Sequence, residues 1–250
     1  MSGFDIAVAL WAAGSLPILF ATLQHTAPYG RYRREGWGST IPAVSAWIGM
    51  EAVSLVLFTA LFITAGRFTD PALWVFWLMF AVHYTNRTVI YPLRSRMAAT
   101  TMPLSVMLMA MAFNTVNAGA NGWGLFHGEH GYGAAWLTDP RLVVGVVIFL
   151  GGMAINLHAD AVLRGLRRPG ETGYQIPFGG MYRFVSCPNY LGEIIEWVGF
   201  AVATWSLPAL AFALWTIANL APRARSHHRW YREKFPDYPR DRRALVPFVW

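Results

Sequence analysis

The sequence predicts an all-α integral membrane protein with seven transmembrane helices, its N-terminus outside and its C-terminus in the cytosol. Of the 250 residues, 55% are hydrophobic, 15% aromatic and only 13% charged, a composition unlike that of a water-soluble domain. The hydrophobic residues occur in long runs with few charges, as helices that cross a bilayer require. The distribution of basic residues between these runs predicts how the helices are oriented in the membrane.

Seven apolar runs mark the expected helices. A helix needs about 20 apolar residues to cross the hydrocarbon core, with about 17 as the lower limit. In chain order the runs are residues 6–24, 41–65, 71–82 with an extension to 91, 97–120, 142–157, 190–204 and 207–220. The last three are short for a span. The first has no basic flank before it, so we interpret it as a span rather than a cleaved signal peptide.

The basic residues orient these helices. If loops alternate from an outer N-terminus, most of the 20 Lys and Arg residues fall on the inner side, in segments 31–34, 94–96, 164–168, 183 and 223–243. This asymmetry follows the positive-inside rule. It accounts for the net charge of +7, so no nucleic-acid partner is expected. With no soluble domain or repeat in between, residues 1–250 are expected to form one membrane domain.

Two polar side chains are expected at similar depth in the bundle. Glu51 lies ten residues into the second helix from its inner end, or about 15 Å at 1.5 Å per residue. Tyr84 lies seven residues, or about 10 Å, from the inner end of the third helix. Ionisable groups inside a membrane span are costly, which favours a functional role for Glu51. His83 is interpreted as a core histidine with a satisfied hydrogen bond.

Further polar residues gather at the inner ends of the last three helices. Asn156 and Asp160 end the fifth helix, Asn189 and Glu193 begin the sixth, and His227 and Tyr231 follow the seventh. Because residues one helical turn apart share a face, Asn156 and Asp160 are expected to point at one ligand. Glu193 is the better site candidate and Glu196 the more structural carboxyl. The pattern predicts one cavity open to the cytosol.

Several chemistries are disfavoured. The single cysteine, Cys187, excludes an internal disulfide and any cysteine-based metal cluster. No histidine group has metal-ligand spacing, so no metal is expected. Neither a G-x-G-x-x-G strand–helix motif nor a Walker motif is present, so any nucleotide must bind outside the standard soluble folds.

Seven segments together resemble the steroid 5α-reductase family. Residues 179–200 read GGMYRFVSCPNYLGEIIEWVGF, residues 227–240 read HHRWYREKFPDYPR, and the tail 244–248 reads ALVPF. Residues 83–88 (HYTNRT), 156–160 (NLHAD), 166–171 (LRRPGE) and 174–177 (YQIP) match in order, and Glu51 matches more loosely. The resemblance runs from about residue 29 to the C-terminus. It implies a seven-helix membrane reductase that uses NADPH to saturate the 4,5 double bond of a 3-oxo-Δ4 steroid.

The resemblance also implies residue roles. Tyr84, supported by Glu51, would hydrogen-bond the carbonyl oxygen of the substrate. The cofactor pocket, drawn mostly from residues 142–250, would be lined by Asn156, Asp160, Arg167, Tyr174, Asn189, Glu193, His227 and Tyr231, with Tyr29, Tyr91, Arg94 and Arg223. Gln175 and Ala98 replace basic residues frequent in the family. Phosphate contacts are therefore expected from Arg94, Arg96 and Arg167.

The resemblance leaves alternatives open. A related membrane reductase could act on a polyprenol or polyprenal, or on an enoyl thioester. A membrane methyltransferase that uses S-adenosylmethionine has a similar C-terminal region, but methyl transfer needs no enolate stabilisation by Glu51 and Tyr84. A non-enzymatic seven-helix receptor would not need so many polar groups on its inner face. We expect a bacterial family member in the inner membrane, or the endoplasmic reticulum membrane for a eukaryotic one. No obligate protein partner is evident.

Overall fold

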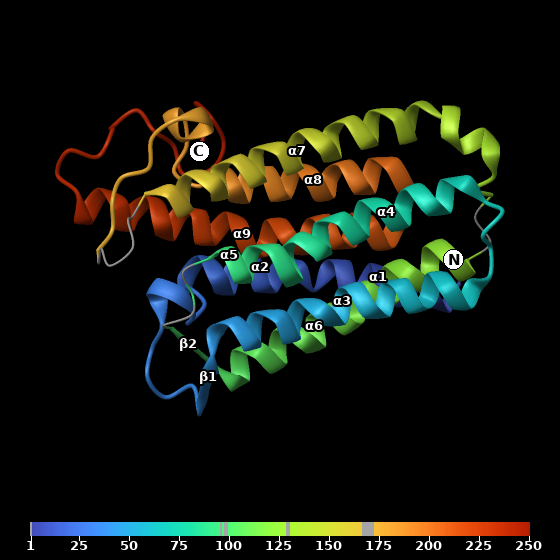
Figure 1. The fold of residues 1–250 in the computed structure, drawn as a ribbon, viewed down its shortest axis with the longest axis horizontal. Coiled ribbons are helices and arrows are strands. Elements are labelled where there is room, and N and C mark those ends of the chain that lie inside the picture. The colour runs from blue at the N-terminus through green and yellow to red at the C-terminus, as the bar shows by residue number, and fades with distance from the viewer. Residues whose placement is uncertain (1, 96, 98–99, 129–130, 167–172) are drawn as a thin grey trace.

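Helices running side by side form an elongated bundle in the computed structural model, which describes residues 2–95, 97, 100–128, 131–166 and 173–250 (Figure 1). The long helices are α1 (Gly3–Ala13), α2 (Ser15–Gln24), α3 (Ala43–Ala65), α4 (Pro71–Thr85), α6 (Leu104–Gly122), α7 (Pro140–Gly165), α8 (Pro188–Thr204) and α9 (Leu207–Lys234). The shorter elements are 3-10 turns at Gly30–Tyr32, Ala134–Thr138 and Gly180–Arg183, π-helical turns at Asn86–Ile90 and Trp123–His127, and α5 (Tyr91–Arg94). The all-α prediction is confirmed.

The starts of two helices differ from expectation. Residues 41 and 97, the predicted helix starts, are not helical: β1 (Thr40–Pro42) pairs antiparallel with β2 (Thr101–Pro103) instead. The helices α3 and α6 begin directly after these strands. Prolines 42 and 103 explain the shift, because a proline disfavours the helical conformation of the residue before it. The predicted seventh run is, conversely, too short, because α9 continues to Lys234.

Glycines bring α7 and α8 into close contact. A Cβ on Gly145 would collide with Ala203, and one on Gly152 would collide with the backbone of Glu196. On α8, a Cβ on Gly199 would likewise strike the backbone of Phe149. Small residues allow helix backbones to approach closely, and dispersion contacts then hold the pair together. This contact places the polar inner ends of α7 and α8 side by side.

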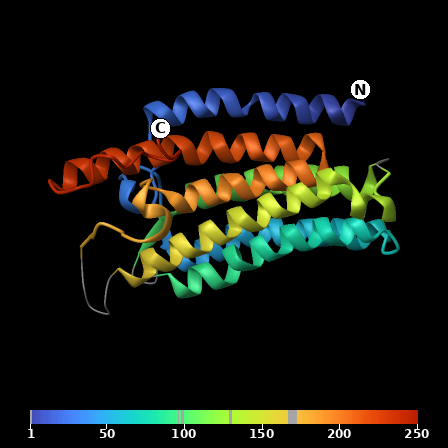
Figure 2. The same ribbon diagram turned by 90° about the horizontal axis from the view of Figure 1, so that it is seen from above.

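The N-terminal helices lie outside the rest of the bundle, against α9 (Figure 2). Trp11 stacks on Trp215 at 4.6 Å between ring centroids, and Trp215 Nε1 donates a hydrogen bond to the carbonyl oxygen of Trp11. Near the other end of the pair, Thr22 Oγ1 donates to the carbonyl of Ala218. Outward side chains such as Leu10 stay largely exposed, as expected for a surface that faces lipid.

Among the described residues, three helical stretches are long and apolar enough to cross a membrane: Gly3–Gln24, Ala43–Ala65 and Pro140–Gly165. The last of these is α7, which is longer than the predicted run 142–157 and is long enough for a span. The structure is thus that of an all-α protein with apolar helices of membrane type. The full set of seven spans and their orientation remain predictions.

Candidate active site

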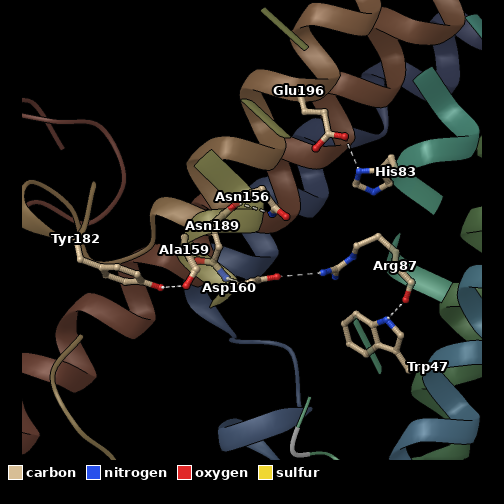
Figure 3. Close-up of polar contacts among 9 residues, drawn as sticks. All are labelled: Trp47, His83, Arg87, Asn156, Ala159, Asp160, Tyr182, Asn189 and Glu196. Carbon is tan, nitrogen blue, oxygen red and sulfur yellow. Dashed lines mark hydrogen bonds and ion pairs between the residues drawn. The ribbon is translucent and has the colours of Figure 1, made fainter. Parts of the chain in front are cut away.

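Arg87 lies at the centre of the first polar cluster, which Figure 3 shows. Its Nη1 is 4.0 Å from Asp160 Oδ2 of α7, and its guanidinium lies over the rings of Trp47 and Tyr91 at 4.9 and 4.5 Å. The Trp47 indole donates to the Arg87 carbonyl at 3.0 Å. Arg87 belongs to the π-helical turn Asn86–Ile90, an element that is frequent at functional sites.

The inner ends of α7 and α8 are joined by amide hydrogen bonds. Asn156 Nδ2 donates to the carbonyl oxygen of Asn189 at 2.9 Å, and Asn189 Nδ2 donates to Asp160 Oδ1 at 3.2 Å. Asn156 and Asp160 therefore point to the same side of α7, as their spacing predicts. A buried carboxylate needs such donors to offset its lost hydration.

Glu51 and Tyr84 reach this cluster from α3 and α4. Tyr84 is buried, Glu51 is only partly buried, and the two groups interact electrostatically. Glu51 also interacts with Arg87 and Glu193. Among the described residues, the side chains of Glu51 and Glu193 make no hydrogen bond or ion pair. Two carboxyl groups that keep their oxygens free of such bonds in the described part of the chain, beside a partly buried cation, are suited to contact a bound molecule.

His83 and Glu196 form a separate pair deeper in the bundle (Figure 3). His83 Nδ1 lies 2.8 Å from Glu196 Oε1, and both side chains are almost completely buried. His83 also packs edge-on against Trp197 at 4.5 Å. The pair joins α4 to α8, which agrees with the interpretation of His83 as a satisfied core histidine and of Glu196 as structural.

A second cluster surrounds Arg223 on α9. The Arg223 guanidinium lies 3.7 Å from the centroid of the Tyr29 ring, and its Nε donates to the Tyr190 hydroxyl at 3.1 Å. His227, one turn further along α9, is bonded at Nε2 to Tyr190 and at Nδ1 to Tyr32. Burial is the main cause that raises the pKa of Tyr32 to about 12. Burial, followed by Arg31 and Arg223, lowers the pKa of His227, so its imidazole is neutral.

Next to this cluster, Arg31 sits among three aromatic rings. Its guanidinium lies 4.2 Å from the Trp230 ring, 4.7 Å from Tyr174 and 5.2 Å from Tyr231. A cavity of about 140 Å³ adjoins them, lined by Arg31, Leu163, Leu166, Tyr174, Gln175 and Tyr231. Within the described residues, the buried Nη1 of Arg31 has no hydrogen-bond partner. A guanidinium with a spare donor beside a cavity is suited to an anionic group.

The predicted site residues thus fall into two groups. Glu51, Tyr84, Tyr91, Asn156, Asp160, Asn189 and Glu193 surround Arg87, whereas Tyr29, Tyr174, Arg223, His227 and Tyr231 lie around Arg223 and Arg31. Arg94 is exposed at the end of α5, and Arg167 and Arg96 lie outside the described residues. The described residues contain no group of three or more His, Cys, Asp or Glu that could hold a metal.

Sequence reasoning missed Arg87, Arg31 and Tyr190. The sequence did contain a signal for Arg87. Ionisable residues inside an apolar run are usually functional, and this argument applies to Arg87 as it does to Glu51. The expectation that buried polar groups gather in the inner half is incomplete. Asn114, Asn117 and Asn121 are all buried along α6, a helix from which no site residue was predicted.

A polar cluster of one cation and several carboxyl groups, enclosed by apolar helices of membrane type, marks a functional site within a membrane protein. The family model described as 3-oxo-5-alpha-steroid 4-dehydrogenase matches residues 100–250. The chain is 44% identical to a cotton (Gossypium hirsutum) protein named steroid 5-alpha-reductase DET2, over 94% of this chain and 93% of that protein. It is 42% identical to 3-oxo-5-alpha-steroid 4-dehydrogenase 1 of Rattus norvegicus, over 89% and 86%.

These matches show the family to which the chain belongs. It belongs to the steroid 5α-reductase family, as the sequence motifs indicate. The human 3-oxo-5-alpha-steroid 4-dehydrogenase 1 is 40% identical over 90% of this chain and 87% of its own length. Members of this family are oxidoreductases that act on CH–CH groups, and the chain is an enzyme of that class.

Proposed function

We propose that the chain reduces the 4,5 double bond of 3-oxo-Δ4 steroids, with NADPH as the hydride donor. The observation that carries the proposal is the meeting of Glu51 and Tyr84 with the Arg87 cluster inside an apolar bundle. The relatives are named as steroid 5α-reductases or 3-oxo-5-alpha-steroid 4-dehydrogenases, which supports this substrate class. An apolar, flat substrate suits a site surrounded by apolar helices.

The chemistry requires a donor at the substrate's carbonyl oxygen. Hydride addition to the far carbon of an enone places negative charge on that oxygen, and a proton from solvent then completes the saturated ketone. Tyr84 would donate a hydrogen bond to the oxygen, and a protonated Glu51 carboxyl would be a second donor. Donors fixed in a dry site stabilise the developing charge more than the neutral ketone. When bound, NADPH supplies the hydride.

The cofactor would be held by both polar clusters. The unpaired Arg31 Nη1 at the cavity beside Tyr174 and Tyr231 fits a phosphate-bearing molecule, although a cavity of about 140 Å³ holds only part of one. We assign cofactor contacts to Asn156, Asp160, Tyr174, Asn189, Glu193, His227, Tyr231, Arg223, Tyr91 and Tyr29, with Arg94 and Arg167 as phosphate contacts. Residues 142–250 would provide most of these contacts within a single domain, 1–250.

The proposed topology has seven spans, with the N-terminus outside and the C-terminus in the cytosol. The bundle of Figure 1 supports it, because the Arg-rich C-terminal tail lies at the same end of the bundle as α5 and the start of α8. The last part of α9, after residue 220, would then project into the cytosol and carry His227 and Tyr231. The membrane would be the inner membrane of a bacterium, or that of the endoplasmic reticulum in a eukaryote.

A substrate panel tests the function. The purified protein in proteoliposomes would be supplied with NADPH and, separately, a 3-oxo-Δ4 steroid, a polyprenal and an enoyl thioester. We expect NADPH oxidation with the steroid alone, and a product that is two mass units heavier by mass spectrometry. NADPH oxidation with only the polyprenal or only the thioester would show that this compound, and not the steroid, represents the substrate class. No oxidation with any substrate, but methyl transfer from S-adenosylmethionine, would refute the reductase assignment.

A further inference from the structure

The helix α6 contributes no residue to the proposed site, yet it carries a buried row of amides. Asn114, Asn117 and Asn121 are 7%, 1% and 0% exposed. Their spacing of three and four residues puts all three on one face of the helix. Burying an amide in an apolar bundle costs free energy unless hydrogen bonds offset its desolvation.

The first of these amides bonds to the backbone next to Glu51. Asn114 Nδ2 donates to the carbonyl oxygen of Met50 at 2.7 Å, and this bond is fully buried. Met50 directly precedes Glu51 in α3. A shift of α3 by one residue along its neighbour changes depth by about 1.5 Å and rotation by about 100°. The bond to Met50 therefore sets the depth and the direction from which Glu51 enters the cluster.

The other contacts between α3 and α6 include the β1–β2 pairing directly before both helices and apolar contacts along them. Gly49 faces the terminal methyl of Met107, and Gly122 faces Leu61. Such apolar contacts are strong but not directional. In a membrane, a hydrogen bond between helices adds the direction that packing lacks. Asn114 provides that directional contact at the level of Glu51.

Ser54 and Asn117 continue the same arrangement. Ser54, one turn after Met50, is 0% exposed and its hydroxyl interacts with the Tyr84 phenol, without the geometry of a full hydrogen bond. In the described part of the chain, Asn117 Nδ2 also has no partner. A buried hydroxyl of α3 thus lies beside Tyr84, and a buried amide of α6 follows Asn114 along the same face of that helix.

We propose that Asn114 is a positioning residue, which fixes the register of α3 against α6 through the Met50 carbonyl and so aims the Glu51 carboxyl at the substrate. The inference rests on the proposed role of Glu51 in catalysis. It gives α6 an indirect part in the reaction, although this helix contributes no residue to the proposed site. Asn114 itself touches neither substrate nor cofactor.

The test separates turnover from cofactor binding. Asn114→Leu keeps the size of the side chain and removes the donor, and we expect kcat to fall at least about tenfold, because small misplacements of catalytic groups are costly. The KM for NADPH should stay within about twofold, since the cofactor contacts come from other helices. Asn114→Gln, which retains the donor, should recover part of the rate. Asn114→Ala serves as a second truncation where the leucine variant does not fold.

Two controls distinguish positioning from general stability. Thr115→Val changes the adjacent exposed residue, whose hydroxyl bonds only within α6, and should leave kcat unchanged. Asn121→Leu removes a buried bond to the Pro208 carbonyl of α9 and should lower the unfolding temperature without a selective loss of kcat. Equal loss of kcat in Asn121→Leu and Asn114→Leu would overturn the inference.

A double variant tests the route through Glu51. If Asn114 acts by placing Glu51, then Asn114→Leu should cost nothing further in a Glu51→Gln background. Losses that multiply would overturn the inference and leave the proposed function intact. If Glu51→Gln alone has the normal rate, the catalytic role of Glu51 fails instead. Normal turnover by Asn114→Leu together with slow turnover by Glu51→Gln would overturn only the role of Asn114.

Discussion

Gly192 of α8 lies directly against the backbone of Asn156 in α7. A Cβ on this glycine would come within 2.5 Å of the Asn156 nitrogen and 2.6 Å of the Gly152 oxygen. The close approach brings Asn156 within 2.9 Å of the Asn189 carbonyl, a bond that joins the two helices at the Arg87 cluster. The glycine therefore shapes the site although it carries no chemistry itself.

Gly192→Val should both destabilise the protein and weaken cofactor binding. The added side chain must push α7 and α8 apart, and overpacking of this kind costs about 1–3 kcal/mol. Thermal unfolding in detergent and NADPH titration measure the two effects. Gly151→Val is the control, because a Cβ at this exposed α7 glycine meets nothing within 4 Å. Equal unfolding temperatures for the two variants would contradict the packing argument.

Tyr84→Phe and Glu51→Gln should each slow turnover by about 10²–10³-fold, the usual loss for one donor to a developing oxyanion. NADPH affinity should persist, because neither residue is among the proposed cofactor contacts. Steady-state kinetics and NADPH titration provide the measurements. Tyr132→Phe offers a matched control, since its buried hydroxyl donates to the carbonyl of Thr204, which lies at the opposite end of α8 from Asn189 and Glu193. Normal turnover by both active-site variants would show that the catalytic assignment is wrong.

Arg223→Gln should weaken NADPH binding by about 10- to 100-fold, because a hydrogen bond from a charged group contributes about 1.5–3 kcal/mol. Arg223 is buried against Tyr29 and Tyr190. Arg225, two residues further along the same helix, is exposed, so Arg225→Gln should bind NADPH normally. Isothermal titration compares the two. An unchanged dissociation constant for Arg223→Gln would remove Arg223 from the cofactor site.

His83→Leu should lower the free energy of unfolding by about 3 kcal/mol, because it leaves the Glu196 carboxyl buried without its partner. The double variant His83→Leu/Glu196→Met replaces the pair by apolar groups and should recover much of that loss. Chemical or thermal unfolding in detergent provides the comparison. A double variant less stable than His83→Leu would argue that the pair is more than a structural connection between α4 and α8.

Acidification should destabilise the inner end of α9. Burial lowers the pKa of His227 and also that of His228 in the folded protein, so the unfolded chain binds protons first. Stability is then complete above the unfolded pKa of about 6.5 and falls as the pH drops towards the folded values. Unfolding temperatures between pH 7.5 and 5 should show this slope. His227→Gln and His228→Gln should each flatten it, and an unchanged slope in both would contradict the assignment.

The helical class of the fold and most of the polar residues of the two clusters followed from patterns in the chain. Apolar length and the distribution of Arg are local properties, and so are the one-turn spacings of Asn156 with Asp160 and of Asn189 with Glu193. Boundaries were less accurate where hydrophobicity continued through a strand, as at residues 41–42. There the prolines and the pairing of β1 with β2 determine the backbone conformation. A count of apolar residues does not detect pairing between distant segments.

The sequence by itself thus determined the class of the fold, the family and the residue types at the site. The tertiary structure decided which of those residues meet. Arg87 faces Asp160 because a π-helical turn rotates it, Arg31 joins the site because aromatic rings from distant segments enclose it, and Asn114 reaches Met50 because glycines let α3 and α6 approach. Each depends on the mutual rotation of packed helices. That rotation is set by side-chain contacts summed over the whole interface, which no local pattern in the chain records.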